Sequence, residues 1–204
     1  MLRQALLLIV TVALFGVLVP WLKGFGFLDP LMIVCYACLG VLYVAPACAE
    51  AFGKQPQGSR EATVRKMAVL ASYGAGVSML MLLSGILTVN VANWHGSFVG
   101  PRWPLLLAAL LLSVTACAAV VAVTTVVASS YGPKAAKSMI RIALLVFLLA
   151  LVFGYPRLPE DAKFQLELNL TTSGLTRLAL EFSALLALVS ASLTAWWISR
   201  VRTH

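Results

Sequence analysis

The stretch MAVLASYGAGVSMLMLLSGILTVNVANWHGSFVGP, residues 67–101, carries no Asp, Glu, Lys or Arg in 35 positions. A helix crosses the hydrocarbon of a bilayer in about 20 mostly apolar residues. Further uncharged runs occupy residues 4–22, 30–49, 103–133, 142–156 and 182–199. The chain of 204 residues is 61% hydrophobic and 11% charged, whereas soluble domains are roughly 25% charged. The sequence therefore predicts a polytopic membrane protein and excludes an ordinary water-soluble fold.

We predict an all-α fold of one domain with six transmembrane helices. They are expected at residues 3–22, 31–50, 66–92, 104–130, 138–155 and 177–199. Asp29 and Pro30 suit a helix start, because Asp caps the first amides and Pro fits the first position. Pro104 plays the same part for the fourth helix, and Gly132 with Pro133 ends it.

The distribution of Lys and Arg predicts the orientation. With both termini in the cytosol, ten basic residues face inward and five face outward, as the positive-inside rule requires. The ten are Arg3, Lys54, Arg60, Arg65, Lys66, Lys134, Lys137, Arg141, Arg200 and Arg202. The net charge of +8 then meets anionic lipid headgroups. We therefore expect a multi-pass protein of the plasma (inner) membrane that does not bind nucleic acid.

Rows of small residues four apart predict close helix packing. The third helix has such a row through Ser72 and Gly76, with a second row at Gly74 and Ser78. The last helix has a row through Ser183, Ala187 and Ala191. The third, fourth and sixth helices are therefore expected to form the packed centre, and the first and fifth to face lipid. These faces join helices of one chain or of two protomers, and the sequence leaves both open.

No helix broken in mid-span is expected, because Pro20 and Pro46 both lie near predicted helix ends. Transporters with inverted repeats use such broken helices to build their binding sites. No convincing motif relates residues 1–100 to residues 101–204, and an inverted repeat of two three-helix halves stays as the alternative.

Cys35 and Cys38 form a CxxC pair in the second helix. Such a pair is typical of a thiol–disulfide relay, but a relay usually needs a second exposed pair, and none exists in the sequence. Buried Cys also behaves as a small hydrophobic residue. Packing is therefore the favoured interpretation, with a redox role as the alternative.

No other pattern predicts catalysis or a cofactor. The only histidines are His95 and His204, outside the predicted spans, which excludes haem ligation by histidines across helices. Glu181 follows Arg177 at the spacing of an i,i+4 ion pair, so a structural role is expected. We therefore expect no enzyme activity, no metal and no cofactor.

Residues 164–170 alternate strictly between apolar and polar side chains. Phe164, Leu166, Leu168 and Leu170 are the apolar members. Period two predicts a short extracytoplasmic strand, which is not stable alone. It either pairs with a second protomer or a partner's sheet edge, or lies on the headgroups with its apolar side down.

The loop at 50–66 is the second candidate contact surface. A helix that runs from Ser59 into the third span would project about 12 Å from the membrane over residues 59–66. Lys54, Arg60, Arg65 and Lys66, with Lys134 and Lys137 of the loop at 131–141, are the expected partner contacts. The alternative is a basic loop held by anionic lipid.

Six spans without catalytic groups favour a permease-like membrane subunit of a multi-component transporter or exporter. A cytosolic ATPase would supply energy, and an extracytoplasmic partner or a second copy would meet the outer loop, in a homo- or hetero-oligomer. The layout resembles small six-helix exporter permeases driven by an ATPase, although no motif carries the likeness. The alternatives are a non-catalytic accessory subunit of a larger membrane complex and a thiol oxidoreductase using Cys35 and Cys38.

Overall fold

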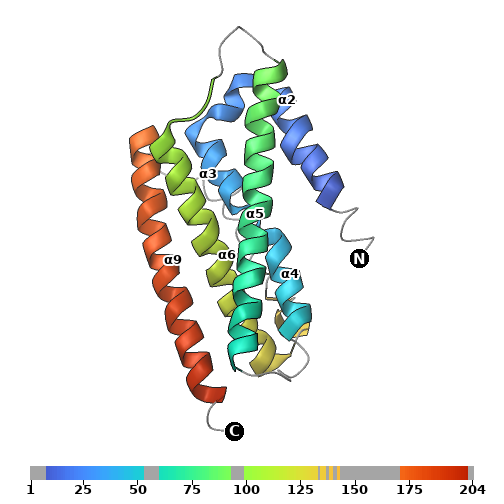
Figure 1. Ribbon diagram of the computed structural model, residues 1–204, viewed down its shortest axis with the longest axis vertical. Helices are drawn as coiled ribbons and strands as arrows, with labels where there is room; N and C mark the ends of the chain where they lie inside the picture. The colour runs from blue at the N-terminus through green and yellow to red at the C-terminus, as the bar shows by residue number, and fades with distance from the viewer. Residues whose placement is uncertain are drawn as a thin grey trace.

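The chain is almost wholly helical wherever its structure is described. The computed structural model describes residues 8–52, 60–92, 99–132, 134–136, 138–139, 142 and 171–201, and these contain no strand. Five stretches in them are long and apolar enough to cross a membrane. They are Leu8–Leu28, Pro30–Cys48, Glu61–Ala92, Trp103–Tyr131 and Thr172–Ser199. The protein is therefore an all-α, multi-pass membrane protein (Figure 1).

Three long helices lie close to their predicted positions. They are α5 (Arg60–Ala92), α6 (Trp103–Tyr131) and α9 (Thr172–Val201). The predicted span at 138–155 falls outside the described residues except for Ser138, Met139 and Ile142, and the predicted strand at 164–170 falls outside them entirely. α6 and α9 begin at the same end of the bundle (Figure 1).

The helix-start and helix-stop signals act as predicted. The Asp29 carboxylate accepts a hydrogen bond from the Leu31 amide at 2.9 Å, and Pro30 opens α3 (Pro30–Cys38). Pro104 lies in the first turn of α6. Gly132 ends that helix with φ 86°, a left-handed conformation that glycine adopts without steric penalty. These local signals correctly predict where α3 begins and where α6 begins and ends.

The first span is longer and less regular than predicted. After helical residues 8–11 it continues as a π-helix η1 (Val12–Leu18), a short α2 (Val19–Lys23) and a 3-10 turn η2 (Gly24–Leu28). The prediction ended it at residue 22, ahead of the charge on Lys23. The Lys23 side chain is exposed, and a long cationic side chain extends to water while its backbone stays in an apolar segment. Its charge therefore did not mark the end of the span.

Pro20 explains the irregular backbone of the first span. Proline has no N–H, so carbonyls one turn before it lose their helical donor. The Tyr36 hydroxyl donates to the Phe15 carbonyl at 2.8 Å. The Thr88 hydroxyl shares its one hydrogen between the Gly16 carbonyl at 3.2 Å and the Ser84 carbonyl of its own helix at 2.8 Å. Side chains of α3 and α5 thus complete the hydrogen bonding of the first span.

The centre of the bundle differs from the prediction. α5 and α6 contact each other, and both contact α3 and α4 (Val41–Phe52). The first span packs on α5 at one edge, as predicted for a helix facing lipid, and α9 packs on α6 at the other edge (Figure 1). In α9 only 11% of the membrane window is buried, against 50% in α5 and 56% in α6. The second span therefore occupies the central place that we expected the last helix to fill.

The two ends of the bundle are fastened by polar side chains. At the upper end of Figure 1, where α5 ends and α6 and α9 begin, the Asn90 side chain donates to the Val99 carbonyl and accepts from the Val99 amide, both at 2.7 Å. At the lower end, the Trp197 indole donates to the Ser129 hydroxyl at 3.2 Å. These bonds hold the start of α6 against α5 and the end of α9 against α6.

Replacing Tyr36 by Phe tests the hydroxyl bond to the first span. The Tyr36 ring packs edge-on against Phe27, with centroids 4.8 Å apart, and Phe keeps that contact. Loss of the donor leaves the Phe15 carbonyl unpaired in an apolar environment, so the free energy of unfolding should fall by about 1–3 kcal/mol. Unfolding in mixed detergent micelles measures it. Tyr73→Phe is the matched control, because Tyr73 is exposed and should change stability little. Equal losses in the two variants would contradict the assignment.

Candidate functional site

The second span is interrupted near its middle. α3 ends at Cys38, α4 begins at Val41, and Leu39 and Gly40 form a turn between them. The Gly40 amide donates to the Ser78 hydroxyl of α5 at 2.6 Å. The turn also keeps backbone bonds from the Leu39 amide to the Tyr36 carbonyl and from the Leu42 amide to the Leu39 carbonyl. A side chain from a neighbouring helix therefore adds to the backbone bonds that stabilise the turn.

Two glycines allow the interruption to lie directly against α5. A methyl group on Gly40 would collide with the Gly74 carbonyl oxygen. A methyl group on Gly74 would collide with Val44 and come within 2.9 Å of the Cys117 sulfur. Close backbone approach at small residues is the main source of helix association in lipid. The crossing of α5 with the second span therefore depends on both residues being glycine.

The expectation of an unbroken second helix was wrong. It rested on the absence of a mid-span proline, and Pro46 indeed lies further along, inside α4. The break instead comes from Gly40, whose amide is satisfied from 38 residues away. Local sequence around residue 40 carries no sign of that acceptor, so the sequence alone does not predict the interruption.

Two hydroxyl groups on the buried face of α6 lie unpaired among the described residues. The Ser113 and Thr124 hydroxyl oxygens are buried and have no hydrogen-bond partner among the described residues. Thr115 and Thr125, in contrast, donate to carbonyls of their own helix. A buried hydroxyl without a partner is uncommon in proteins. The buried face of α6 therefore carries two polar atoms that make no hydrogen bond within the described part of the bundle.

The four cysteines are free thiols. Cys35 is exposed on α3, and Cys38 packs beside the cluster formed by Ala108, Leu112 and Ala179. Cys48 and Cys117 are buried in one apolar cluster between α4 and α6. Three of the four thiols thus lie in helix contacts, the role that the packing interpretation gives them, and the redox alternative for Cys35 and Cys38 stays a hypothesis.

Some residues of the predicted packing rows are buried in helix contacts, and others are exposed. Ser72 and Gly76 lie on the exposed face of α5, and the second row of that helix, Gly74 and Ser78, forms the crossing with the second span. On α9, Ser183 is buried and donates to the Ala179 carbonyl at 2.6 Å. Ala187 and Ala191 further along that row are exposed.

The lower end of the bundle carries the predicted basic surface. A groove of about 420 Å³ runs along the first turns of α5, lined by Glu61, Ala62, Arg65, Lys66 and Val69. The Lys66 ammonium donates to the Ala51 carbonyl at 3.1 Å and lies 5.2 Å from the centre of the Phe52 ring. Lys66 therefore ties α5 to the end of α4, while the exposed Arg65 side chain remains available in the groove wall.

Only part of the predicted contact surface is described. Arg60 is the first residue of α5, and Lys134 is exposed beyond the end of α6. Lys54, Lys137 and the apolar residues of the predicted strand, Phe164, Leu166, Leu168 and Leu170, lie outside the described residues. The structure thus brings Arg65 and Lys66 into one groove and leaves the placement of the others open.

The described centre of the bundle is lined mainly by apolar side chains. The polar atoms in the middle of the bundle are hydroxyls and thiols, and in the described part of the chain no three His, Cys, Asp or Glu side chains come together as a metal site requires. No protein-family model, curated protein or solved structure matches the chain.

The pair Gly74→Ala and Gly76→Ala tests the central crossing with one substitution on two faces of α5. Gly74→Ala should lower the free energy of unfolding by about 1–3 kcal/mol, because the methyl group overpacks the contact with Val44 and Cys117. Gly76 has nothing within 4 Å of the added methyl, so Gly76→Ala should be neutral or stabilise by up to about 1 kcal/mol. Denaturation in detergent measures both. Equal effects would show that the crossing is not tight.

Proposed function

We propose that the protein is a permease-like membrane subunit of a multi-component transporter that works with a cytosolic energising partner. The observation that carries the proposal is the interruption of the second span at Leu39–Gly40. It lies in mid-span, with nine residues of α3 before it and twelve of α4 after it. Transporter folds use discontinuous helices near the bilayer midplane to expose backbone groups that bind the solute or the coupling ion.

The hydrogen bond from the Gly40 amide to the Ser78 hydroxyl holds the interrupted span against α5 and can break and re-form. A single neutral bond between a backbone amide and a hydroxyl contributes about 0.5–1.5 kcal/mol net, which thermal motion or a bound solute can offset. The hydroxyls of Ser113 and Thr124 add polar atoms to the adjoining α6. A neutral, hydroxyl-lined interior favours a solute without strong charge over a proton-coupled mechanism, which needs intramembrane ionisable groups.

The groove at the lower end supports the proposed docking of a cytosolic energising partner. Positive-inside bias puts this end in the cytosol, with both termini there. Arg65 is exposed in the wall of the groove, and α5 is an unbroken helix from Arg60 to Ala92. A cytosolic partner that pushes on the first turns of α5 therefore acts on the same rigid rod that carries Gly74 and Ser78. This connection couples the groove to the interruption.

Reversing the charge at Arg65 tests the docking of the partner. The tagged chain would be purified in mild detergent from cells that produce it naturally, and ATP hydrolysis by the recovered complex would be assayed. Arg65→Glu should reduce recovery of the ATP-hydrolysing protein by about tenfold, which corresponds to about 1.4 kcal/mol of binding energy. Lys23→Glu, at the other end of the bundle, is the control and should leave recovery unchanged. Recovery with only electron-transfer or structural subunits would instead make this chain an accessory subunit.

Removal of the Ser78 hydroxyl tests the interruption itself. Ser78→Ala should leave recovery of the partner unchanged and alter ATP turnover of the complex several-fold, because the closure of the second span is lost. Ser72→Ala is the matched control, since Ser72 lies on the exposed face of the same helix. Unchanged turnover in a folded Ser78→Ala complex would remove the interruption from the mechanism.

A further inference from the structure

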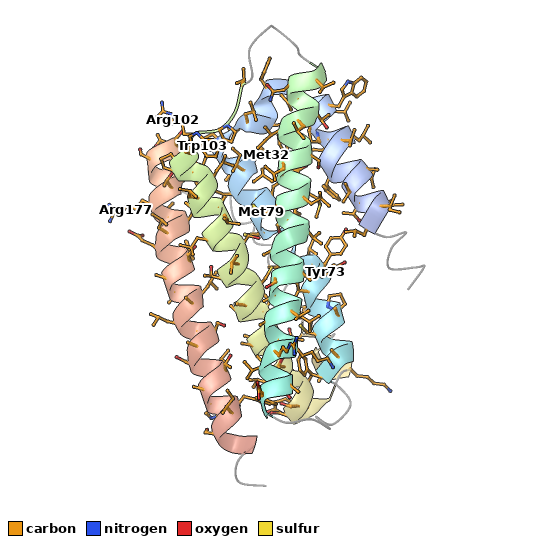
Figure 2. The ribbon with its side chains drawn as sticks, in the orientation of Figure 1. Met32, Tyr73, Met79, Arg102, Trp103 and Arg177 are labelled. Carbon is orange, nitrogen blue, oxygen red and sulfur yellow. The ribbon has the colours of Figure 1, made fainter. Side chains whose placement is uncertain are left out.

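A second hollow lies at the upper end of the bundle, where α6 and α9 begin side by side. Its volume is about 440 Å³. Arg102 and Pro104 line it from the start of α6, and Ser173, Arg177 and Leu180 line it from the start of α9. Figure 2 shows Arg102 above the start of α9 and Arg177 beside its first turns, at the left of the bundle. Two arginines 75 residues apart in the sequence thus line one cavity.

Both guanidinium groups have hydrogen-bond donors to spare. Arg177 uses its Nε to donate to the Glu181 carboxylate at 2.7 Å, and within the described part of the chain its Nη atoms make no further bond. Arg102 has no ion pair or side-chain hydrogen bond with any described residue. A guanidinium carries five N–H donors arranged in a fork that matches phosphate and carboxylate oxygens. The wall of the cavity therefore has an excess of positive charge and of donors.

The backbone adds to the same field. The first amides of a helix have no helical acceptor, and the helix dipole places partial positive charge at that end. Here two helices, α6 and α9, start at the same cavity. Pro104 has no N–H, the Gly174 amide donates to the Thr171 hydroxyl, and the Thr176 hydroxyl donates to the Thr172 carbonyl. The helix starts therefore contribute positive potential, and the hydrogen bonds to an anion come from the guanidinium groups.

The depth of the cavity points to a lipid rather than to a solute in water. Trp103, the neighbour of Arg102, is 77% exposed, and exposed Trp residues gather at headgroup depth in membrane proteins. Below Arg177 and Leu180, the same face of α9 continues through Ala184 and Leu188, which are both exposed. A cationic cradle with an apolar track beneath it matches a molecule that has a phosphate at one end and hydrocarbon at the other.

We propose that this cavity binds the phosphate headgroup of an anionic phospholipid, with an acyl chain lying along α9 below Leu180. Arg102 and Arg177 hold the phosphate oxygens, and Glu181 sets the strength of binding because its charge opposes that of the lipid. With both chain termini in the cytosol, the lipid belongs to the outer leaflet. The site does not depend on the transport role proposed above.

Native mass spectrometry of the purified full chain in neutral detergent, titrated with phosphatidylglycerol, tests the site. The double variant Arg102→Gln/Arg177→Gln should raise the dissociation constant of the tightest lipid by at least about tenfold. Lys23→Gln removes one positive charge at the same end of the bundle, outside the cavity, and should leave binding unchanged. All three side chains are exposed, so these variants should fold. Equal weakening by Lys23→Gln, or none in the double variant, would overturn the proposal.

A variant with the opposite expected sign guards against a general loss of structure. Glu181→Gln removes the acidic side chain that lines the cavity and should tighten phosphatidylglycerol binding several-fold. Weaker or unchanged binding in this variant would contradict the assigned role of Glu181 and with it the charge argument.

Two further ligands identify the source of the phosphate. Diacylglycerol, which has the acyl chains without phosphate, should not bind at the tightest site. Inorganic phosphate in large excess should not displace phosphatidylglycerol, because it gains nothing from the apolar track. Displacement by inorganic phosphate would show that the cavity serves a soluble anion, and binding of diacylglycerol would show that the guanidinium groups do not recognise the headgroup. Either result would overturn the lipid assignment.

Discussion

Hydrocarbon offers no hydrogen-bond partner, so each backbone group that leaves its helix must find one inside the protein. The first two spans both depart from regular helix, at Pro20 and at Gly40. In each case a hydroxyl from another span supplies the missing partner: Tyr36 and Thr88 serve the first span, and Ser78 serves the second. Two of these three hydroxyls belong to α5. The position of α5 in the bundle thus follows from the irregularities of its neighbours as much as from its own apolar surface.

Features encoded within a few residues were predictable from the sequence. The start of α3 at Asp29 and Pro30, the end of α6 at Gly132 and the ion pair between Arg177 and Glu181 all follow from short-range chemistry, and the structure confirms them. The break at Gly40 was not predictable, because Ser78 stabilises it from across the bundle. The two small-residue rows of α5 also look alike in sequence, since Ser72 with Gly76 and Gly74 with Ser78 share the same spacing. Only the neighbouring backbone distinguishes them.

The same contrast holds for the candidate sites. Arg65 and Lys66 were predicted as contacts because they adjoin the third span in a basic loop, and both line the lower groove. Arg102 is one of the five basic residues expected on the outer side, and Arg177 is expected in an ion pair with Glu181. Their convergence depends on α6 and α9 starting at the same end. A signal existed in the sequence, since each Arg lies within a few residues of a predicted helix start, but nothing there showed that the two starts adjoin.

The dependence of the first span on later spans has a consequence for biogenesis. When the ribosome has made only the first span, the Phe15 and Gly16 carbonyls have neither the Tyr36 nor the Thr88 hydroxyl as donor. Each unpaired group in hydrocarbon carries a penalty of several kcal/mol. The segment therefore gains from remaining in the insertion machinery, or in the wet interface, until Thr88 has emerged. Release into lipid is then favoured as a helical group, and the order of synthesis becomes the order of assembly.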